Sequence, residues 1–203
     1  MKKIMTLLVA AQFALSGFCL SGCASRQAEQ AVSYDFGPLP PLAESRPLHP
    51  LIIADVNAPA WLDSHMMFFR LGYANDRQPR SYANSRWVMP PAQLFGQRLK
   101  ARIAQAGGAA LSESDGAVNL PSVHIENDDF IQLFTAPDQS AGQVTMRVSV
   151  LNGRLLLGQK SFTRQVPAPS PDATGGAQAL ASASDALITD VIAWLAGLPL
   201  KKQ

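Results

Sequence analysis

Alternating apolar and polar positions predict an antiparallel hairpin in the second half of the chain. Every other residue from Val144 to Val150 is apolar, and the residues between them are Thr, Arg and Ser. This alternation is typical of a strand with one buried face. Asn152-Gly153 favours a tight turn, so we expect Leu155 to Val166 to return as the next strand.

Shorter apolar runs upstream predict further strands. The candidates are residues 34–36, 51–56, 66–71 and 123–133. Residues 51–56 are almost continuously apolar, which predicts a central strand buried on both faces. The alternation in 123–133 changes parity near Asp128-Asp129, and a bulge there would reconcile its two halves. Residues 72–84 are polar and rich in turn-forming residues, so we expect a surface loop.

Helical spacing of apolar residues predicts two helices. Pro90-Pro91 opens the first and Gly107-Gly108 follows it, as helix punctuation requires. Its apolar stripe consists of Phe95, Leu99, Ile103 and Ala106, and its basic residues are expected on a solvated face: Arg98, Lys100 and Arg102. The second is predicted after Thr174-Gly175-Gly176, with an apolar stripe of Leu180, Leu187, Val191, Leu195 and Leu198.

Together these elements predict an α+β fold. We expect a single mixed or antiparallel sheet of about six strands, with two main helices packed on one face. The length of 203 residues favours one domain, which we place at residues 34–203.

The first 33 residues have the pattern of an export signal and a tether. Lys2 and Lys3 precede an apolar stretch from residue 4 to 20, as in a secretory signal. Leu20-Ser21-Gly22-Cys23 then resembles a bacterial lipobox, which predicts a signal peptide at 1–22, lipid attachment at Cys23 and a polar tether over 23–33. The alternatives are an ordinary signal peptide or an uncleaved membrane helix. No Asp follows at the second position, a pattern similar to the outer-membrane sorting signal of Gram-negative lipoproteins, so the domain would face the periplasm.

Charge and composition argue against several functions. The formal charge is +2, and without the two lysines of the signal peptide 15 cations face 15 anions, so nucleic-acid binding is not expected. No pair of His or Cys has metal-ligand spacing, and the chain lacks both a Gly-x-Ser-x-Gly turn and a Gly-Lys-Ser/Thr phosphate loop. We therefore expect no enzyme activity, no metal and no cofactor beyond the lipid on Cys23. Glu126 with Asp128-Asp129 is expected to be a solvated bulge.

Aromatic, Met and Arg residues are concentrated between residues 58 and 91. Interfaces are enriched in these residue types, although the same aromatics could fill the core of the sheet. The candidate partner-binding residues are Trp61, Arg70, Arg77, Arg86 and Trp87.

The same segment resembles a known family. Ala60-Trp-Leu-Asp63, Tyr82-Ala-Asn-Ser-Arg-Trp87, Pro90-Pro-Ala-Gln-Leu94 and Gln97-Arg-Leu99 are similar to motifs of the ABC-type transport auxiliary lipoproteins, the family that includes paraquat-inducible protein C. The resemblance implies a periplasmic domain tethered to the outer membrane. It also implies a partner, the MCE-domain protein that forms a lipid conduit from an inner-membrane complex, and an energy source located elsewhere.

Three functional hypotheses follow. The first is a non-catalytic lipoprotein that docks the conduit with its 58–91 surface. The alternative is a stand-alone periplasmic carrier, which would hold acyl chains in an apolar cavity of roughly 300 to 1,000 Å³. A third possibility is an assembly factor without a transport role, which would have the same export signal and lipid anchor. The sequence leaves open whether the chain forms a homo-oligomer.

Overall fold

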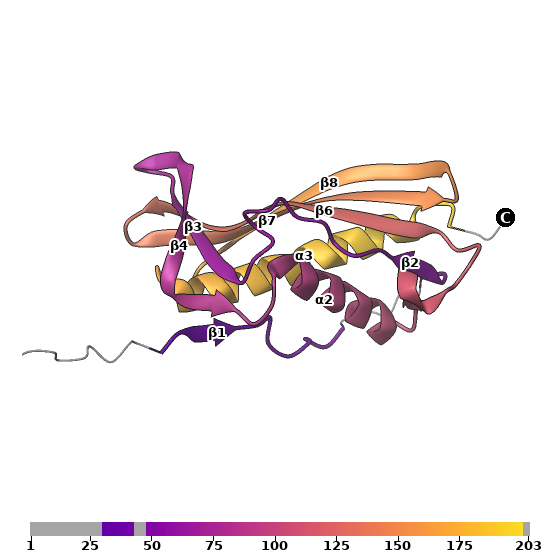
Figure 1. The fold of residues 1–203 in the computed structure, drawn as a ribbon, viewed down its shortest axis with the longest axis horizontal. Coiled ribbons are helices and arrows are strands. Elements are labelled where there is room, and N and C mark those ends of the chain that lie inside the picture. The colour runs from indigo at the N-terminus through magenta and orange to yellow at the C-terminus, as the bar shows by residue number, and fades with distance from the viewer. Residues whose placement is uncertain (1–29, 43–47, 201–203) are drawn as a thin grey trace, which may run out of the picture. The chain divides into compact units, whose positions relative to one another are not determined.

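Residues 31–42 and 48–200 fold into a long, twisted sheet with helices on one side (Figure 1). In this computed structural model, residues 30–42 and 48–200 are described; the signal peptide, Cys23 and most of the tether lie outside them. The strands are β1 (Val32–Tyr34), β2 (Leu51–Ile53), β3 (Met66–Leu71), β4 (Asn75–Trp87), β5 (Ala110–Ser112), β6 (Ser122–Ala136), β7 (Gln139–Asn152) and β8 (Leu155–Pro167). The helices are α2 (Pro91–Gln105), α3 (Ala173–Ala196) and the short 3-10 helix Glu113–Asp115.

β6 is the strand on which the sheet is organised. One of its edges pairs antiparallel with β7, and β7 pairs antiparallel with β8. The other edge pairs in parallel with two separate strands, β2 near the start of β6 and β3 near its end. β4 and then β1 extend the sheet beyond β3, and β5 extends it beyond β2.

Both helices lie on the same side of this sheet, which confirms the expected α+β fold (Figure 1). The sheet has eight strands among the described residues, compared with about six expected. We call the side that carries no helix the open face. The predicted alternation is confirmed in β7: its residues Val144, Met146, Val148 and Val150 are fully buried. The Asn152-Gly153 turn and the bulge after Asn127 are also as expected.

α3 supplies most of the apolar surface that covers the sheet. Its buried residues include Leu180, Leu187, Ile188, Val191 and Leu195. By length and composition α3 is also a helix that could cross a membrane, but its apolar residues pack into the core of the domain. It begins earlier than expected, at Ala173, because Asp172 accepts a hydrogen bond from the Gly175 N–H at 2.8 Å and so caps it.

The glycines at the start of α3 lie inside the helix rather than before it. A Cβ on Gly176 would come within 2.0 Å of Gln132 Oε1. Gln132 is fully buried; it accepts a hydrogen bond from Tyr82 Oη and donates one to Ser140 Oγ. The glycine therefore allows α3 to approach a buried polar network closely.

The prediction of a loop over residues 72–84 is wrong, because β4 begins at Asn75. Most of its side chains are exposed on both faces, so it shows no apolar alternation. Its pairing with β3, in which Phe69 lies opposite Arg80 and Arg70 opposite Pro79, makes it a strand. Backbone pairing of this kind is invisible to hydrophobic periodicity. β1 and β2 also differ in bounds from the expected 34–36 and 51–56.

Candidate functional site

Several candidate partner-binding residues meet on the open face of β3. Met67 is fully buried on the helix side, so its alternating neighbours Met66, Phe68 and Arg70 lie on the open face. The Trp61 ring packs edge-on against the Phe68 ring, with centroids 5.3 Å apart. Trp61 is 37% exposed and Met66 55% exposed.

Arg86 joins this group because it lies directly opposite Met66 in the pairing of β3 with β4. We define the β3 surface as Trp61, Met66, Phe68, Arg70 and Arg86. The structure thus brings together three of the five candidates that the sequence suggested.

Arg70 is held in place by an acidic neighbour. Its Nη1 lies 3.6 Å from Asp129 Oδ2, and that oxygen also accepts a hydrogen bond from Gln143 Nε2 at 3.0 Å. Burial raises the pKa of Asp129 above its usual value, while the charge of Arg70 and the Gln143 hydrogen bond lower it in part. The expectation that Asp129 belongs to a solvated bulge is therefore wrong.

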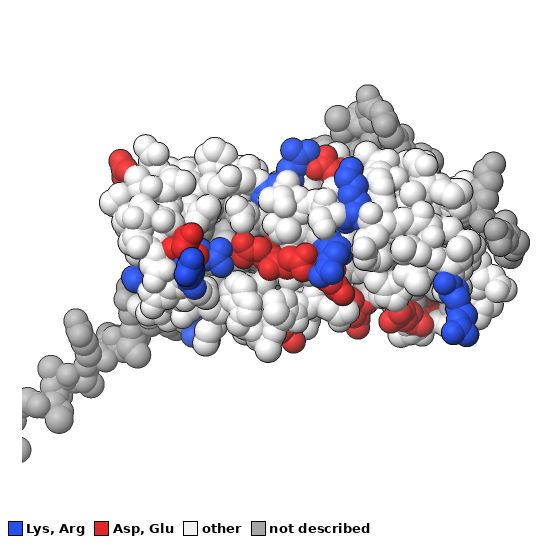
Figure 2. All heavy atoms as spheres, turned by 90° about the horizontal axis from the view of Figure 1, so that it is seen from above, with Lys and Arg blue, Asp and Glu red and all other residues white. Residues whose placement is uncertain are grey.

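The remaining carboxylates of that cluster are solvated as expected. Glu126 and Asp128 both form ion pairs with Arg147 on the open face. Charged side chains run in a band along the middle of this face (Figure 2). No group of three His, Cys, Asp or Glu is placed to hold a metal ion in the described part of the chain.

Arg77 lies apart from the β3 surface, toward the tip of the β3–β4 hairpin. Its side chain is exposed and its N–H donates to Asn75 Oδ1 at 3.1 Å. Tyr73, in the turn, is 49% exposed. The hairpin tip projects beyond the plane of the neighbouring strands (Figure 1).

Trp87 does not belong to any surface, which corrects its expected role in partner binding. It is 1% exposed, and its ring packs edge-on against Phe36 and Phe130, with centroids 5.9 and 5.6 Å away. Successive residues of a strand point to opposite faces, so Arg86 is exposed while its neighbour Trp87 fills the core.

Arg98 and Arg102 were expected on a solvated face of α2, and this expectation is wrong. They are 9% and 5% exposed. Arg98 donates two hydrogen bonds to the Asp185 carboxylate of α3, at 2.9 and 3.1 Å, and three more to backbone carbonyls of residues 36–38. Arg102 donates to the Pro40 carbonyl at 2.7 Å and also reaches Asp185. Arg98 and Arg102 are four residues apart, so the sequence places them on one face of α2. A solvent-exposed basic face has the same spacing, so the sequence could not show that these residues are buried.

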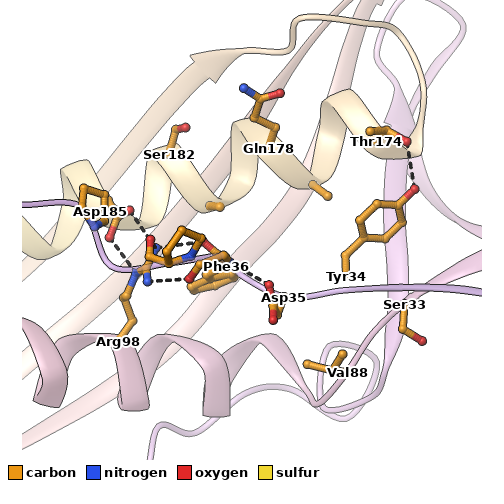
Figure 3. A pocket seen from close by; sticks show the side chains of 15 residues that line it. Ser33, Tyr34, Asp35, Phe36, Val88, Arg98, Thr174, Gln178, Ser182 and Asp185 are labelled. Atoms are coloured by element: carbon orange, nitrogen blue, oxygen red, sulfur yellow. Dashed lines mark hydrogen bonds and ion pairs between the residues drawn. The ribbon is translucent and has the colours of Figure 1, made fainter.

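A groove of about 500 Å³ lies beside this contact, between the segment after β1 and α3. Arg98 with Asp185 closes one end, and the hydrogen bond of 2.9 Å between the Tyr34 and Thr174 hydroxyls closes the other (Figure 3). Ala177, Gln178 and Ser182 of α3 line it. The lining is therefore mixed: apolar side chains such as Phe36 and Val88 lie together with polar ones and with the arginine–carboxylate pair.

The chain matches known proteins in family and in fold. The model of the family described as "ABC-type transport auxiliary lipoprotein component" matches residues 35–192. A DUF330 protein from Xanthomonas campestris has a similar structure, with a TM-score of 0.66, 16% identity and coverage of 83% of this chain and 94% of the other. An uncharacterised protein has a TM-score of 0.63 at 13% identity, covering 82% and 99%. No curated protein matches in sequence. Because the family model spans more than half of its length, the chain belongs to the family of ABC-type transport auxiliary lipoprotein components.

Proposed function

We propose that the chain is a non-catalytic, outer-membrane-anchored lipoprotein that docks the MCE-domain conduit of an intermembrane lipid transport system on the periplasmic side. Family membership supports the auxiliary role in transport. The lipobox ending at Cys23 supports the anchor. The observation that carries the docking role is the β3 surface, where an aromatic pair, an exposed Met and two arginines lie side by side.

The β3 surface has the chemistry of an interaction site. Partly exposed Trp and Arg side chains are the residue types that most often dominate binding energy. The packing of Trp61 on Phe68 and the contact of Arg70 with Asp129 fix these side chains before a partner arrives. Less side-chain entropy is then lost on binding.

The packing inside the domain favours docking over lipid carriage. A carrier needs an apolar cavity between the sheet and the helices. In this chain the rings of Phe36, Trp87 and Phe130 contact one another in that space. The groove of about 500 Å³ beside α3 has apolar lining residues, but it also contains the Arg98–Asp185 ion pair, and burying an acyl chain against those charges would be unfavourable.

The docking role is tested by co-purification of the conduit protein with surface variants. The double variant Trp61→Ala, Arg86→Glu should recover much less MCE-domain protein from detergent-solubilised envelopes than the wild type. Val118→Ala is the matched control, because Val118 is 76% exposed and lies outside the β3 surface. Equal recovery from all three proteins would contradict the proposal, and phospholipid retained by the purified protein in native mass spectrometry would favour the carrier.

A further inference from the structure

β8 leaves one edge of the sheet unpaired over its 13 residues, since among the described strands it pairs with β7 alone. The Ala168 N–H donates to the carbonyl of Ser140 directly opposite, at 2.9 Å. In an antiparallel ladder such hydrogen-bonded pairs alternate with pairs whose N–H and C=O groups point away. In the β7–β8 register, the residues with outward-pointing backbone groups are Gln159, Ser161, Thr163 and Gln165.

A groove runs along this free edge on the helix side. Its volume is about 490 Å³, and it is lined by residues 160–164 of β8 and by Asp190, Ala193 and Trp194 of α3. Of these β8 residues, Lys160, Phe162 and Arg164 lie on the helix side. The rings of Phe162 and Trp194 meet edge-on with centroids 5.7 Å apart. The groove therefore offers a mostly polar lining, with the partly exposed Trp194 ring as its aromatic part, beside a row of free backbone groups.

The charged residues on this edge strand are all basic. β8 carries Lys160 and Arg164 and no acidic residue. Arg164 is neutralised by two hydrogen bonds to the Asp190 carboxylate. Lys160 lies over the Phe162 ring, 5.0 Å from its centroid, and forms no ion pair with any described residue. The uncompensated positive charge thus sits beside the Phe162 ring.

We propose that the β8 edge and its groove bind an extended acidic segment of a partner protein by antiparallel strand addition. Strand addition draws affinity from main-chain hydrogen bonds and specificity from pockets for alternate side chains. An acidic side chain of the segment would meet Lys160, and an apolar one would pack against Phe162 and Trp194. A second copy of β8 is disfavoured, because pairing two such strands brings like charges together. This site is separate from the β3 surface and does not depend on the identity of the conduit.

The geometry makes a specific prediction about the backbone of the bound segment. In a hydrogen-bonded antiparallel pair, opposite residues point their side chains to the same face. Ser161 lies opposite Arg147, whose side chain is on the open face. The amides of the segment that bond to β8 therefore belong to its open-face residues. Methylating those amides should abolish binding, whereas methylating the groove-facing amides should not.

The test uses a labelled ten-residue peptide in which Thr alternates with Glu, Phe or Val, titrated into the full lipoprotein in detergent micelles by fluorescence anisotropy. We expect saturable binding that is lost when the Thr amides are N-methylated and retained when the other amides are. A peptide with Lys in place of Glu should bind more weakly, and Lys160→Glu should reverse that order. Arg154→Glu, in the turn between β7 and β8, is the matched charge control.

A second variant tests the backbone contribution. Ser161→Pro removes an N–H that points to the free edge and leaves the pairs with β7 intact, as proline is tolerated on edge strands. This substitution should lower the affinity for the Glu-containing peptide at least about fivefold, which is the factor expected for the loss of one net hydrogen bond. No saturable binding, or equal binding with both N-methylation patterns, would overturn the proposal. A dimer in sedimentation that Ser161→Pro dissociates would also overturn it, in favour of self-pairing.

Discussion

Arg98 shows how single residues hold the segment after β1 against both helices. It uses every nitrogen of its guanidinium group, on a carboxylate of α3 and on carbonyls of residues 36–38. Periodicity could place this arginine on a face of α2 but could not show that a proline-rich segment covers that face. The same limit explains the wrong prediction for Trp87, because the sequence did not show on which face of its strand the ring lies. The exposure of Trp61 and Arg86 agrees with the interface-type composition of their segment, and their role in partner binding stays a prediction.

Replacing Arg98 should destabilise the domain strongly. Arg98→Ala leaves Asp185 and three carbonyls short of a donor in a largely buried site, so we expect the free energy of unfolding to fall by about 3 kcal/mol. Urea denaturation followed by circular dichroism measures it. Arg86→Ala, which removes an exposed arginine, should change stability by less than about 0.5 kcal/mol. Equal losses in both variants would refute the buried role.

Asp129 should make stability depend on pH in an unusual direction. Its pKa is raised in the folded protein, so the folded state binds a proton more readily than the unfolded state. The stabilising contribution is therefore complete below the unfolded pKa of about 3.9 and is lost as pH rises through the higher folded pKa. The stability of the wild type relative to Asp129→Asn should decline with rising pH and then level off. A difference that grows with pH would show that the contact with Arg70 outweighs burial.

At the scale of elements, apolar periodicity predicted the strands and helices that bury an apolar face in the core. The β7–β8 hairpin and α2 followed from their apolar positions and turn residues. β4 did not, because its two faces are mostly polar and its strand structure comes from backbone pairing with β3. The start of α3 was misplaced for a related reason: two glycines usually end or precede a helix, but here they allow close packing.

Gly176 tests this account of close packing. Gly176→Ala places a Cβ against the buried Gln132 side chain and should disturb its hydrogen bonds to Tyr82 and Ser140. We expect a loss of roughly 1 to 3 kcal/mol in the free energy of unfolding. Gly197→Ala serves as the control, since its added Cβ would meet its nearest neighbour at an ordinary 3.4 Å. If Gly176→Ala proves as stable as Gly197→Ala, the packing of α3 does not depend on its close approach to Gln132.

At the scale of the whole domain, the two faces of the sheet carry different kinds of side chain. The helix side is filled by an apolar core in which α3 packs on β7 and β8. The open face carries a charged band (Figure 2). It also carries the β3 surface, on the strands β3 and β4 that Figure 1 labels. Composition could suggest that segment 58–91 holds interface residues, but only the pairing of β3 with β4 shows which of them share a face. This difference between the two faces supports the proposed docking role and places the candidate surface on the open face.

The most direct measurement of the docking claim is photocrosslinking in living cells. A photoreactive amino acid is placed at Met66 or Arg86, which are exposed members of the β3 surface, and at Val118 as the control. Our account predicts adducts with an MCE-domain protein from Met66 and Arg86 and none from Val118. Phospholipid adducts alone, or conduit adducts from Val118 and not from the β3 surface, would contradict it.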